Sequence, residues 1–229
     1  REGKLMGDDD DIDLACFIED YNENFMSKFI SKGWNEMYRF GNNNIGLEIS
    51  LMKNNIKLDL FFFYKEKEYY WHGAWQELYK SGKLVGRNMI KYIYSPFILQ
   101  TTSFKCFQTI TPYPIEEYIV NKYGTDWKKP IKGWDWRFDP SNANITNLIY
   151  YNNSNDIHNE DLDKFIIGKK INNNKEGRYI KSISEGRILL SNGYSNQSRK
   201  LFWIAIKQYP LRITSYGFYI ITLMPSFIH

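Results

Sequence analysis

Apolar and polar residues alternate regularly in two neighbouring segments, which predicts a β-hairpin. In residues 46–51 and 56–64, apolar side chains recur at every second position, the pattern of strands that bury one face. Asn54 and Asn55 lie between the segments and readily adopt the positive φ angles of a tight turn. Short apolar runs within residues 91–112 suit further strands.

Two segments have the spacing of amphipathic helices. The first can be capped by Asp20 or Asn22 and ended by Gly33, and its apolar side is formed by Phe25, Met26, Phe29 and Ile30. The second begins at Pro114, a residue favoured in the first helical turn, and ends at Gly124. We expect both helices to cover the predicted sheet.

The regular pattern stops after residue 142. Residues 143–175 are rich in Asn and in charge, and they are predicted to form a loop or linker. The last stretch, residues 200–229, is apolar and aromatic, but it is broken by Lys207, Pro210, Arg212 and Pro225. These breaks exclude a transmembrane helix. The stretch is expected to form one or two extra strands or an interfacial segment, or to be sequence from an incorrect gene model.

An acidic ladder lies close to the start of the chain. Asp9, Asp11 and Asp13 occupy alternate positions in a run that continues into β-forming residues. On a strand these three carboxylates would point to one face, about 7 Å apart from one to the next. Like charges on one face are unfavourable unless a cation binds them, and oxygen ligands suit Mg²⁺ or Mn²⁺. The alternative is a solvated acidic loop.

A further carboxylate, Asp59, lies within the second strand of the predicted hairpin. The apolar face of this strand is formed by Ile56, Leu58, Leu60 and Phe62, so Asp59 should point to the opposite face. A carboxylate there needs a cation, a basic partner or an open rim. One interpretation is a third metal ligand for phosphoryl transfer. The other is an ion pair with Lys57 or Lys53. Glu48 is a further candidate acid, expected to face solvent.

Composition narrows the functional classes. The chain has 229 residues, 17% of them aromatic, and a net charge of +4 that suits an anionic donor, but its basic residues form no stripe typical of nucleic-acid binding. Cys16, Cys106 and three His residues are too few for a Cys/His metal cluster, and no nucleophilic triad is apparent. We find no signal peptide and no apolar run long enough to span a bilayer.

Several motifs in collinear order over residues 1–142 resemble the LicD/fukutin family. They are REGKLM at residues 1–6, the acidic ladder, KLDLFFFY at 57–64, PYPIEEYI at 112–119, YGTDW at 123–127 and WDW at 134–136. The resemblance implies an α+β (mixed α/β) nucleotidyltransferase-like fold, with a mixed β-sheet flanked by helices. It also implies an N-terminally incomplete domain over residues 1–142, because the family has a glycine-bearing segment upstream of Arg1. Residues 143–175 would then be an Asn-rich linker, and residues 176–229 a divergent C-terminal segment.

The same resemblance implies metal-dependent transfer of ribitol 5-phosphate from CDP-ribitol to a protein-linked O-mannosyl glycan. Asp11 and Asp13 would hold Mg²⁺ or Mn²⁺ on the donor diphosphate, Asp9 would complete the shell through water, and Asp59 would act as ligand or base. Arg1 and Lys4 would lie near the donor phosphates. The tryptophans Trp134 and Trp136 would wall the nucleotide pocket or else seal the core, and Trp71 and His72 would stack on a ligand or pack inside.

Other donors and other functions remain open at this point. CDP-choline or CDP-glycerol could replace CDP-ribitol, the former in a phosphocholine transferase of the LicD type. A nucleotidyltransferase and a non-catalytic module that binds glycans or forms complexes are further alternatives. The family resemblance implies a type II protein on the lumenal face of the Golgi membrane, with an N-terminal anchor outside this chain. Gly7 and Asp8 replace a Pro-Trp pair that often precedes the ladder, so activity of this chain by itself is not implied.

Overall fold

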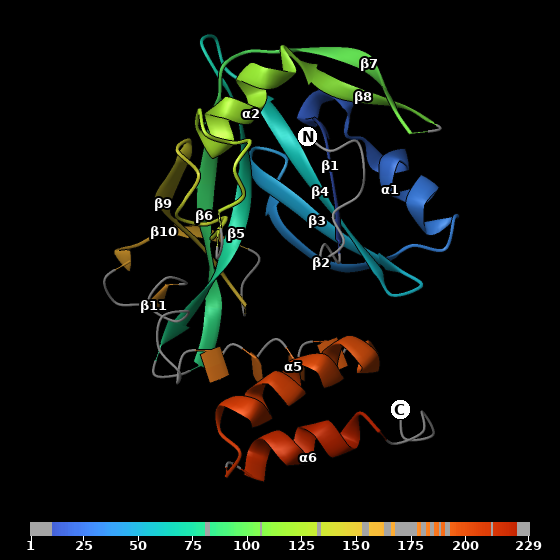
Figure 1. Cartoon of the computed structure of the whole chain (residues 1–229), viewed down its shortest axis with the longest axis vertical. Helices are drawn as coiled ribbons and strands as arrows, with labels where there is room; N and C mark the ends of the chain where they lie inside the picture. The colour runs from blue at the N-terminus through green and yellow to red at the C-terminus, as the bar shows by residue number, and fades with distance from the viewer. Residues whose placement is uncertain are drawn as a thin grey trace. The chain divides into compact units, whose positions relative to one another are not determined.

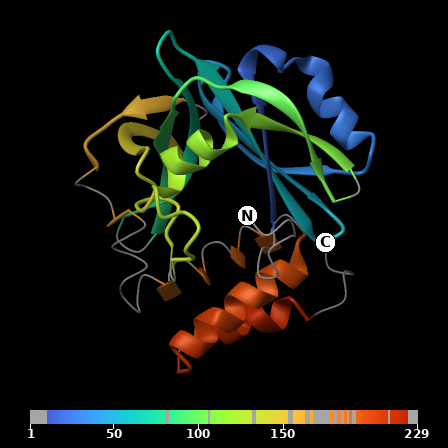
Figure 2. The same ribbon diagram turned by 45° about the horizontal axis from the view of Figure 1, so that its top comes forward.

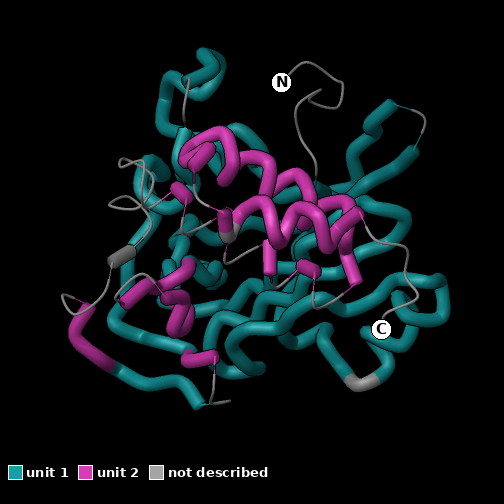
Figure 3. Tube along the Cα trace, turned by 90° about the horizontal axis from the view of Figure 1, so that it is seen from below, with its two compact units in different colours: residues 1–76, 88–150, 154–159 teal, residues 77–87, 151–153, 160–229 magenta. Residues whose placement is uncertain are grey.

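The structure is a computed structural model, and it forms two compact units (Figure 3). The first unit comprises residues 1–76, 88–150 and 154–159, and the second comprises residues 77–87, 151–153 and 160–229. The residues described are 11–80, 83–105, 107–131, 134–152, 156–162, 166–167, 178–179, 182–183, 186–187, 189–190, 193–211 and 213–223.

The predicted hairpin forms the centre of the first unit. Strands β3 (Ile45–Lys53) and β4 (Ile56–Lys65) pair antiparallel, and the turn residues Asn54 and Asn55 have φ angles of 49° and 66°. Strand β2 (Asn35–Asn42) continues the sheet beyond β3. The hairpin prediction is therefore confirmed.

Strand β1 (Asp11–Phe17) lies parallel to β4 on the edge opposite β3 (Figure 1). A short 3-10 turn, η1 (Ile18–Asp20), leads from β1 to helix α1 (Glu23–Ile30). Asn22 caps α1, because its side chain accepts a hydrogen bond from the backbone N–H of Asn24 at 3.0 Å. The first predicted helix is thus confirmed, with Asn22 as its cap.

Two long strands extend the sheet, and the sequence pattern indicated only the end of the second, which lies within residues 91–112. They are β5 (Tyr70–Lys80) and β6 (Lys83–Tyr94), and they are followed in sheet order by β9 (Ala143–Tyr151) and β10 (Ile157–Asn159). The full path runs β10-β9-β6-β5-β4-β3-β2, and β11 (Ile166–Ile167) pairs with β5. A loop was predicted from residue 143, and this is wrong for β9 and β10, which pair antiparallel.

The sheet of the first unit carries a hydrophobic cluster on each face. Leu58, Leu60 and Phe62 of β4 contribute to one cluster, against which residues of α1 pack. Phe63 contributes to the other, together with Ala74, Ile90, Tyr92, Tyr94 and Phe97. The second predicted helix is confirmed as α2 (Ile115–Tyr123), and its Tyr118 packs on this second cluster. A separate two-stranded ribbon is formed by β7 (Ile98–Phe104) and β8 (Phe107–Tyr113).

The second unit contains two helices near the C-terminus, α5 (Ser195–Gln208) and α6 (Ile213–Ile221). Extra strands were one expectation for residues 200–229, and this is wrong for the residues that α5 and α6 contain. Among the described residues, no helix is long and apolar enough to cross a membrane. The chain as a whole is mixed and strand-rich with a curled sheet, which is compatible with an α+β fold. The nucleotidyltransferase-like assignment stays a prediction.

Candidate metal centre

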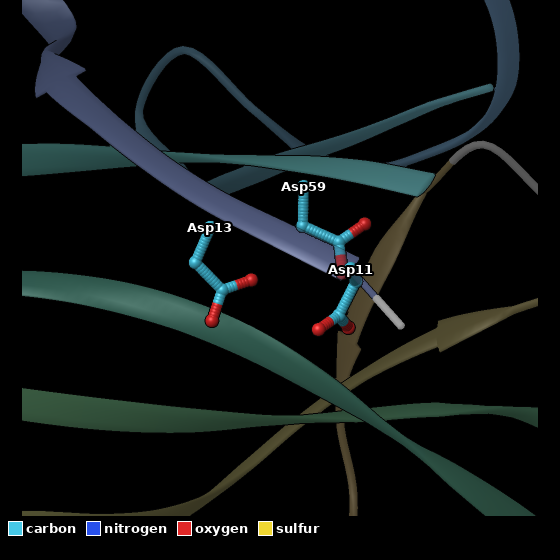
Figure 4. A group of neighbouring side chains, drawn as sticks. All are labelled: Asp11, Asp13 and Asp59. Carbon is cyan, nitrogen blue, oxygen red and sulfur yellow. The ribbon is translucent and has the colours of Figure 1, made fainter. Parts of the chain in front are cut away.

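The parallel pairing of β1 with β4 brings three carboxylates together. Asp13 is the register partner of Asp59, and Asp11 is the partner of Lys57. Because alternate residues of a strand share a face, Asp11 and Asp13 point to the same side as Asp59. One carboxylate oxygen from each of the three lies within 4.8 Å of the others (Figure 4). The expected juxtaposition with Asp59 is present for Asp11 and Asp13, the two ladder residues that the structure describes.

The three acids differ in their exposure to solvent. Asp59 is buried, with 5% of its surface exposed, whereas Asp11 and Asp13 are exposed. The cluster therefore has a closed side at the sheet and an open side towards solvent. Mg²⁺ in proteins usually has carboxylate ligands on one side and an open side for water or phosphate oxygens. The donor set accordingly fits a divalent cation.

Asp59 also has two partners within the sheet. Lys57 donates a hydrogen bond from Nζ to Asp59 Oδ2 at 2.6 Å, and the same Nζ lies 3.9 Å from Asp11 Oδ2. The hydroxyl of Ser50, opposite Asp59 on β3, donates to Asp59 Oδ1. The ion pair weighed as an alternative for Asp59 is therefore formed by Lys57. Lys53 is directed elsewhere, since its Nζ donates to the carbonyl of Lys32.

The ion pair and the metal site are compatible. With Asp11, Asp13 and Asp59 ionised, the single positive charge of Lys57 leaves a net charge of −2, which matches a divalent cation. Burial opposes the charge on Lys57, but Tyr38 and Asp59 outweigh burial and hold the pKa of the ammonium above its usual range. Lys57 therefore stays charged and supports Asp59 from inside the sheet.

The pKa of Asp13 reflects this crowding. Although part of the Asp13 side chain is exposed, the surrounding protein partly desolvates its carboxyl group, and this is the largest cause of the shift. The negative charges of Asp11 and Asp59 add to it, and together these effects raise the pKa of Asp13 to about 6. The positive charges of Lys122 and Lys57 act in the opposite direction. A cation bound among the three acids would favour the ionised form of Asp13, so protons and metal ions should compete at this position.

Glu48 was expected to face solvent, and this is wrong. Its surface is 7% exposed, and its Oε2 accepts a hydrogen bond from the backbone N–H of Trp75 at 2.8 Å. Glu48 lies two residues before Ser50 on β3, so both side chains share the face of Asp59. In a strictly alternating strand Glu48 lies on the same face as Ser50, so the pattern of residues 46–51 would have placed Glu48 on the face of the acidic cluster.

An aromatic wall continues this face of the sheet beyond Asp59. His72 stacks on Tyr92 with a centroid distance of 4.9 Å, and its Nε2 lies 3.4 Å from the hydroxyl of Tyr94. Burial, with a smaller effect from Lys122, lowers the pKa of His72 to about 3, so the imidazole is neutral. On the opposite face of the sheet, Trp71 stacks on Tyr64 at 4.3 Å. Both residues are buried, which favours packing over ligand stacking for Trp71 and His72.

The tryptophans of the WDW motif occupy different environments. Trp134 packs on Tyr123 of α2 at 5.2 Å, whereas the side chain of Trp136 is 40% exposed. The carbonyl of Trp136 accepts a hydrogen bond from Tyr92, which ties the loop to the aromatic wall. Trp136 therefore does not seal the core, and a role of either tryptophan in donor binding stays a prediction. Arg1, Lys4 and Asp9 lie outside the described residues.

Comparisons with known proteins point to one kind of relative. The chain is 36% identical over 144 residues to ribitol-5-phosphate transferase FKTN of Macaca fascicularis and of Homo sapiens, which covers 62% of this chain and 30% of each relative. It is 38% identical over 134 residues to ribitol-5-phosphate transferase FKTN of Mus musculus, which covers 58% of this chain and 28% of the relative. The chain thus spans less than a third of the length of these curated relatives.

No family model matches the chain, and no solved structure matches it. The three relatives share one name and match well over half of the chain, and the chain carries the collinear motifs described above. Together these similarities support a fukutin/LicD-like family for this chain.

Proposed function

We propose that this chain carries the acidic site of a metal-dependent transferase that moves ribitol 5-phosphate from CDP-ribitol to a protein-linked glycan of the O-mannosyl type. The observation that carries the proposal is the convergence of Asp11, Asp13 and Asp59 through the β1–β4 register. The three relatives are named ribitol-5-phosphate transferase, and this name supports ribitol 5-phosphate as the group transferred. CDP-choline and CDP-glycerol remain alternative donors.

Asp11, Asp13 and Asp59 would hold Mg²⁺ or Mn²⁺. The bound ion would supply charge neutralisation on the donor diphosphate and on the leaving phosphate. Asp11 and Asp13 are the exposed members of the cluster, so they would orient the donor. Asp59 already accepts hydrogen bonds from Lys57 and Ser50. These two hydrogen bonds orient the carboxylate within the acidic cluster and leave other lone pairs of Asp59 for a cation, so we favour a ligand role for Asp59 over a role as general base.

The chemical step would be a displacement at phosphorus. The oxygen of a glycan hydroxyl forms a bond to the phosphorus of the ribitol phosphate, the bond from that phosphorus to the bridging oxygen breaks, and CMP leaves with the electron pair. The hydroxyl proton passes to a carboxylate or to water. Catalysis of this kind depends mainly on positioning and on charge stabilisation, both of which an ordered set of acids provides.

A non-catalytic module that binds glycans is the second candidate. Lys57 favours it, because its ammonium already compensates part of the negative charge without a metal ion.

The proposed transferase would be located on the lumenal face of the Golgi membrane, as the family resemblance implies.

Calorimetric titration with Mn²⁺ in the presence of CDP-ribitol tests the proposal. We expect Asp13→Asn to weaken Mn²⁺ binding by more than about tenfold, since one of three charged ligands is lost. Asp126→Asn is the matched control, because Asp126 is an exposed acid of the same unit that pairs with Lys129 at 3.3 Å. Equal Mn²⁺ binding by the native chain and Asp13→Asn, or none by the folded native chain, would exclude the metal site.

Product analysis separates the chemical alternatives. Release of CMP from a CDP-activated donor indicates transfer of a phospho-alditol or phosphocholine, whereas release of pyrophosphate from a nucleoside triphosphate indicates nucleotidyl transfer. Parallel reactions with CDP-ribitol, CDP-choline and CDP-glycerol identify the donor. Glycan binding that persists in the Asp11→Asn/Asp13→Asn variant, without turnover by the native chain, would favour the binding module.

A further inference from the structure

Helix α5 in the second unit presents a mixed apolar and basic face to solvent. Its buried residues are Ser198, Phe202, Ala205 and Ile206. The exposed residues recur three or four positions apart and therefore lie along one side of the helix; they are Asn196, Lys200, Trp203, Ile204 and Lys207. The Nζ of Lys207 lies 5.7 Å from the ring centroid of Trp203, so charge and aromatic surface are adjacent.

Helix α6 presents an apolar face. Its sequence contains no acidic or basic residue. Ile213 is 85% exposed, and the other exposed positions of the helix are Tyr216, Gly217, Ile220 and Ile221. These positions also recur three or four apart, so an apolar stripe runs along the side of α6 that faces solvent. Exposed apolar patches on stable domains commonly mark interaction sites.

The two exposed faces join at an aromatic contact. Helices α5 and α6 lie side by side (Figures 1 and 2), with Phe202 stacked on Phe218 at 5.2 Å. Trp203 lies 5.6 Å from Tyr219. Tyr219 is one helical turn from Tyr216, which is exposed. The face of α5 and the stripe of α6 therefore form one continuous surface, which we call the α5–α6 surface.

The charge of this part of the chain is one-sided. After Glu185 the sequence contains no Asp or Glu, but it contains five basic residues, namely Arg187, Arg199, Lys200, Lys207 and Arg212. The whole chain has a net charge of only +4, so the preceding part is nearly neutral. A partner for this surface must therefore combine apolar groups with negative charge.

We propose that the α5–α6 surface docks on an anionic lipid bilayer and lies in its interface. Basic side chains beside Trp, Tyr and Ile are the composition of helices that bind such interfaces. Helix α5 has 14 residues and α6 has nine, which corresponds to lengths of about 21 Å and 14 Å. Both are shorter than the hydrocarbon core of about 30 Å, so they lie on the bilayer and do not span it.

Two other partners fit the surface less well. A second copy of the chain would bring Lys200 and Lys207 close to the same residues of its partner, and the surface offers no acid to compensate them. A nucleic acid would satisfy the basic residues but would leave Ile213, Ile220 and Ile221 in water. The lipid interface satisfies both kinds of side chain.

Flotation of the 229-residue chain with lipid vesicles tests the proposal. We expect binding to vesicles that contain about a third phosphatidylserine and much weaker binding to pure phosphatidylcholine. Each basic residue at an anionic surface strengthens binding by about fivefold, so Lys200→Gln/Lys207→Gln should weaken it by about 25-fold. Ile220→Ser should weaken it by about tenfold, because Ile220 would no longer bury its side chain in the bilayer.

Matched controls come from the first unit. Ile110 is 66% exposed on β8 and Lys129 is 79% exposed, so Ile110→Ser and Lys129→Gln make the same chemical changes outside the α5–α6 surface. Neither should alter vesicle binding. Brominated lipids should quench part of the tryptophan fluorescence of the native chain, and Trp203→Phe should remove that part while binding persists, because Phe keeps an apolar ring.

Three outcomes would overturn the proposal. The first is no binding by the folded chain, and the second is equal binding to neutral and anionic vesicles. The third is a concentration-dependent dimer, detected by light scattering, that Ile220→Ser converts to a monomer while native vesicle binding is absent; this would identify a second copy as the partner. None of these measurements depends on the metal site, so their failure and that of the proposed transferase are distinguishable.

Discussion

Replacing Lys57 by Met removes the internal counter-charge of the acidic cluster. Asp59 is 5% exposed, and the side chain of Lys57 is 31% exposed, so the pair is largely shielded from solvent. The substitution leaves Asp59 with the hydroxyl of Ser50 and with two acidic neighbours. Hydrogen bonds to charged groups contribute about 1.5–3 kcal/mol, and breaking a fully buried pair costs more. We expect Lys57→Met to lower the free energy of unfolding by about 2–3 kcal/mol when a chelator keeps the protein free of divalent cations.

A divalent cation should reverse this loss. In the variant, Asp59 Oδ2 no longer accepts the Lys57 hydrogen bond and is free to contact a cation. A ligand present at 100 times its dissociation constant stabilises the folded state by about 2.7 kcal/mol, which is close to the expected loss. Mn²⁺ should therefore bind more tightly to Lys57→Met than to the native chain and should stabilise it by a larger amount.

Denaturant unfolding followed by tryptophan fluorescence, with chelator and with Mn²⁺, measures both effects. Lys53→Met is the control, because Lys53 lies on the neighbouring strand and its Nζ donates to the carbonyl of Lys32. That substitution should leave the response to Mn²⁺ unchanged. If Lys57→Met is as stable as the native chain in chelator, or if Mn²⁺ stabilises the variant less than the native chain, the electrostatic argument for the centre is wrong.

Three further expectations concern the same sheet. The pKa of Asp13 is raised from 3.8 to about 6, so the folded chain holds a proton that the unfolded chain has released, and stability in chelator should fall as pH rises from about 4 to 6. Asp13→Asn should flatten this dependence in denaturant titrations across that range. Ser50→Ala should lower the free energy of unfolding by about 1–3 kcal/mol, since it removes a donor to buried Asp59, and an unchanged denaturation midpoint would contradict this. Glu48→Ala should cost a similar amount, because the N–H of Trp75 loses its acceptor, whereas Glu48→Gln should be milder by the same measurement.

The sequence was most informative where apolar residues recur at every second position of a strand. In β4 the apolar positions Leu58, Leu60 and Phe62 set the register, and that register alone placed Asp59 on the opposite face. The ladder of β1 has the same parity, so its approach to Asp59 needed only that the two strands be neighbours. The partnership of β1 with β4 depends on contacts between residues more than 40 positions apart, which local periodicity does not contain.

Strand β5 and most of β6 were missed because most of their residues are buried on both faces. Polar residues among them form hydrogen bonds inside the sheet: the side chain of Gln76 donates to Asn88 at 2.9 Å, and the side chain of Asn88 donates to the carbonyls of Thr146 and Leu148. Such polar residues interrupt the alternation of apolar and polar positions, so the sequence of these strands resembles that of a loop. The Asn-rich sequence of β9 misled in the same way, although β9 supplies the carbonyls that accept from Asn88.

The pairing of β1 also bears on how firmly the start of the described chain is held. Among the described strands, β1 is hydrogen-bonded to β4 alone, and two of its residues carry the charges that repel Asp59. A cation that contacts Asp11, Asp13 and Asp59 together would act as a staple between two segments far apart in sequence. Amide hydrogens of β1 would then exchange with solvent more slowly when the ion is bound, while those of the β3–β4 hairpin would change little. A measurement of ion binding and a measurement of the ordering of β1 would thus report on the same equilibrium.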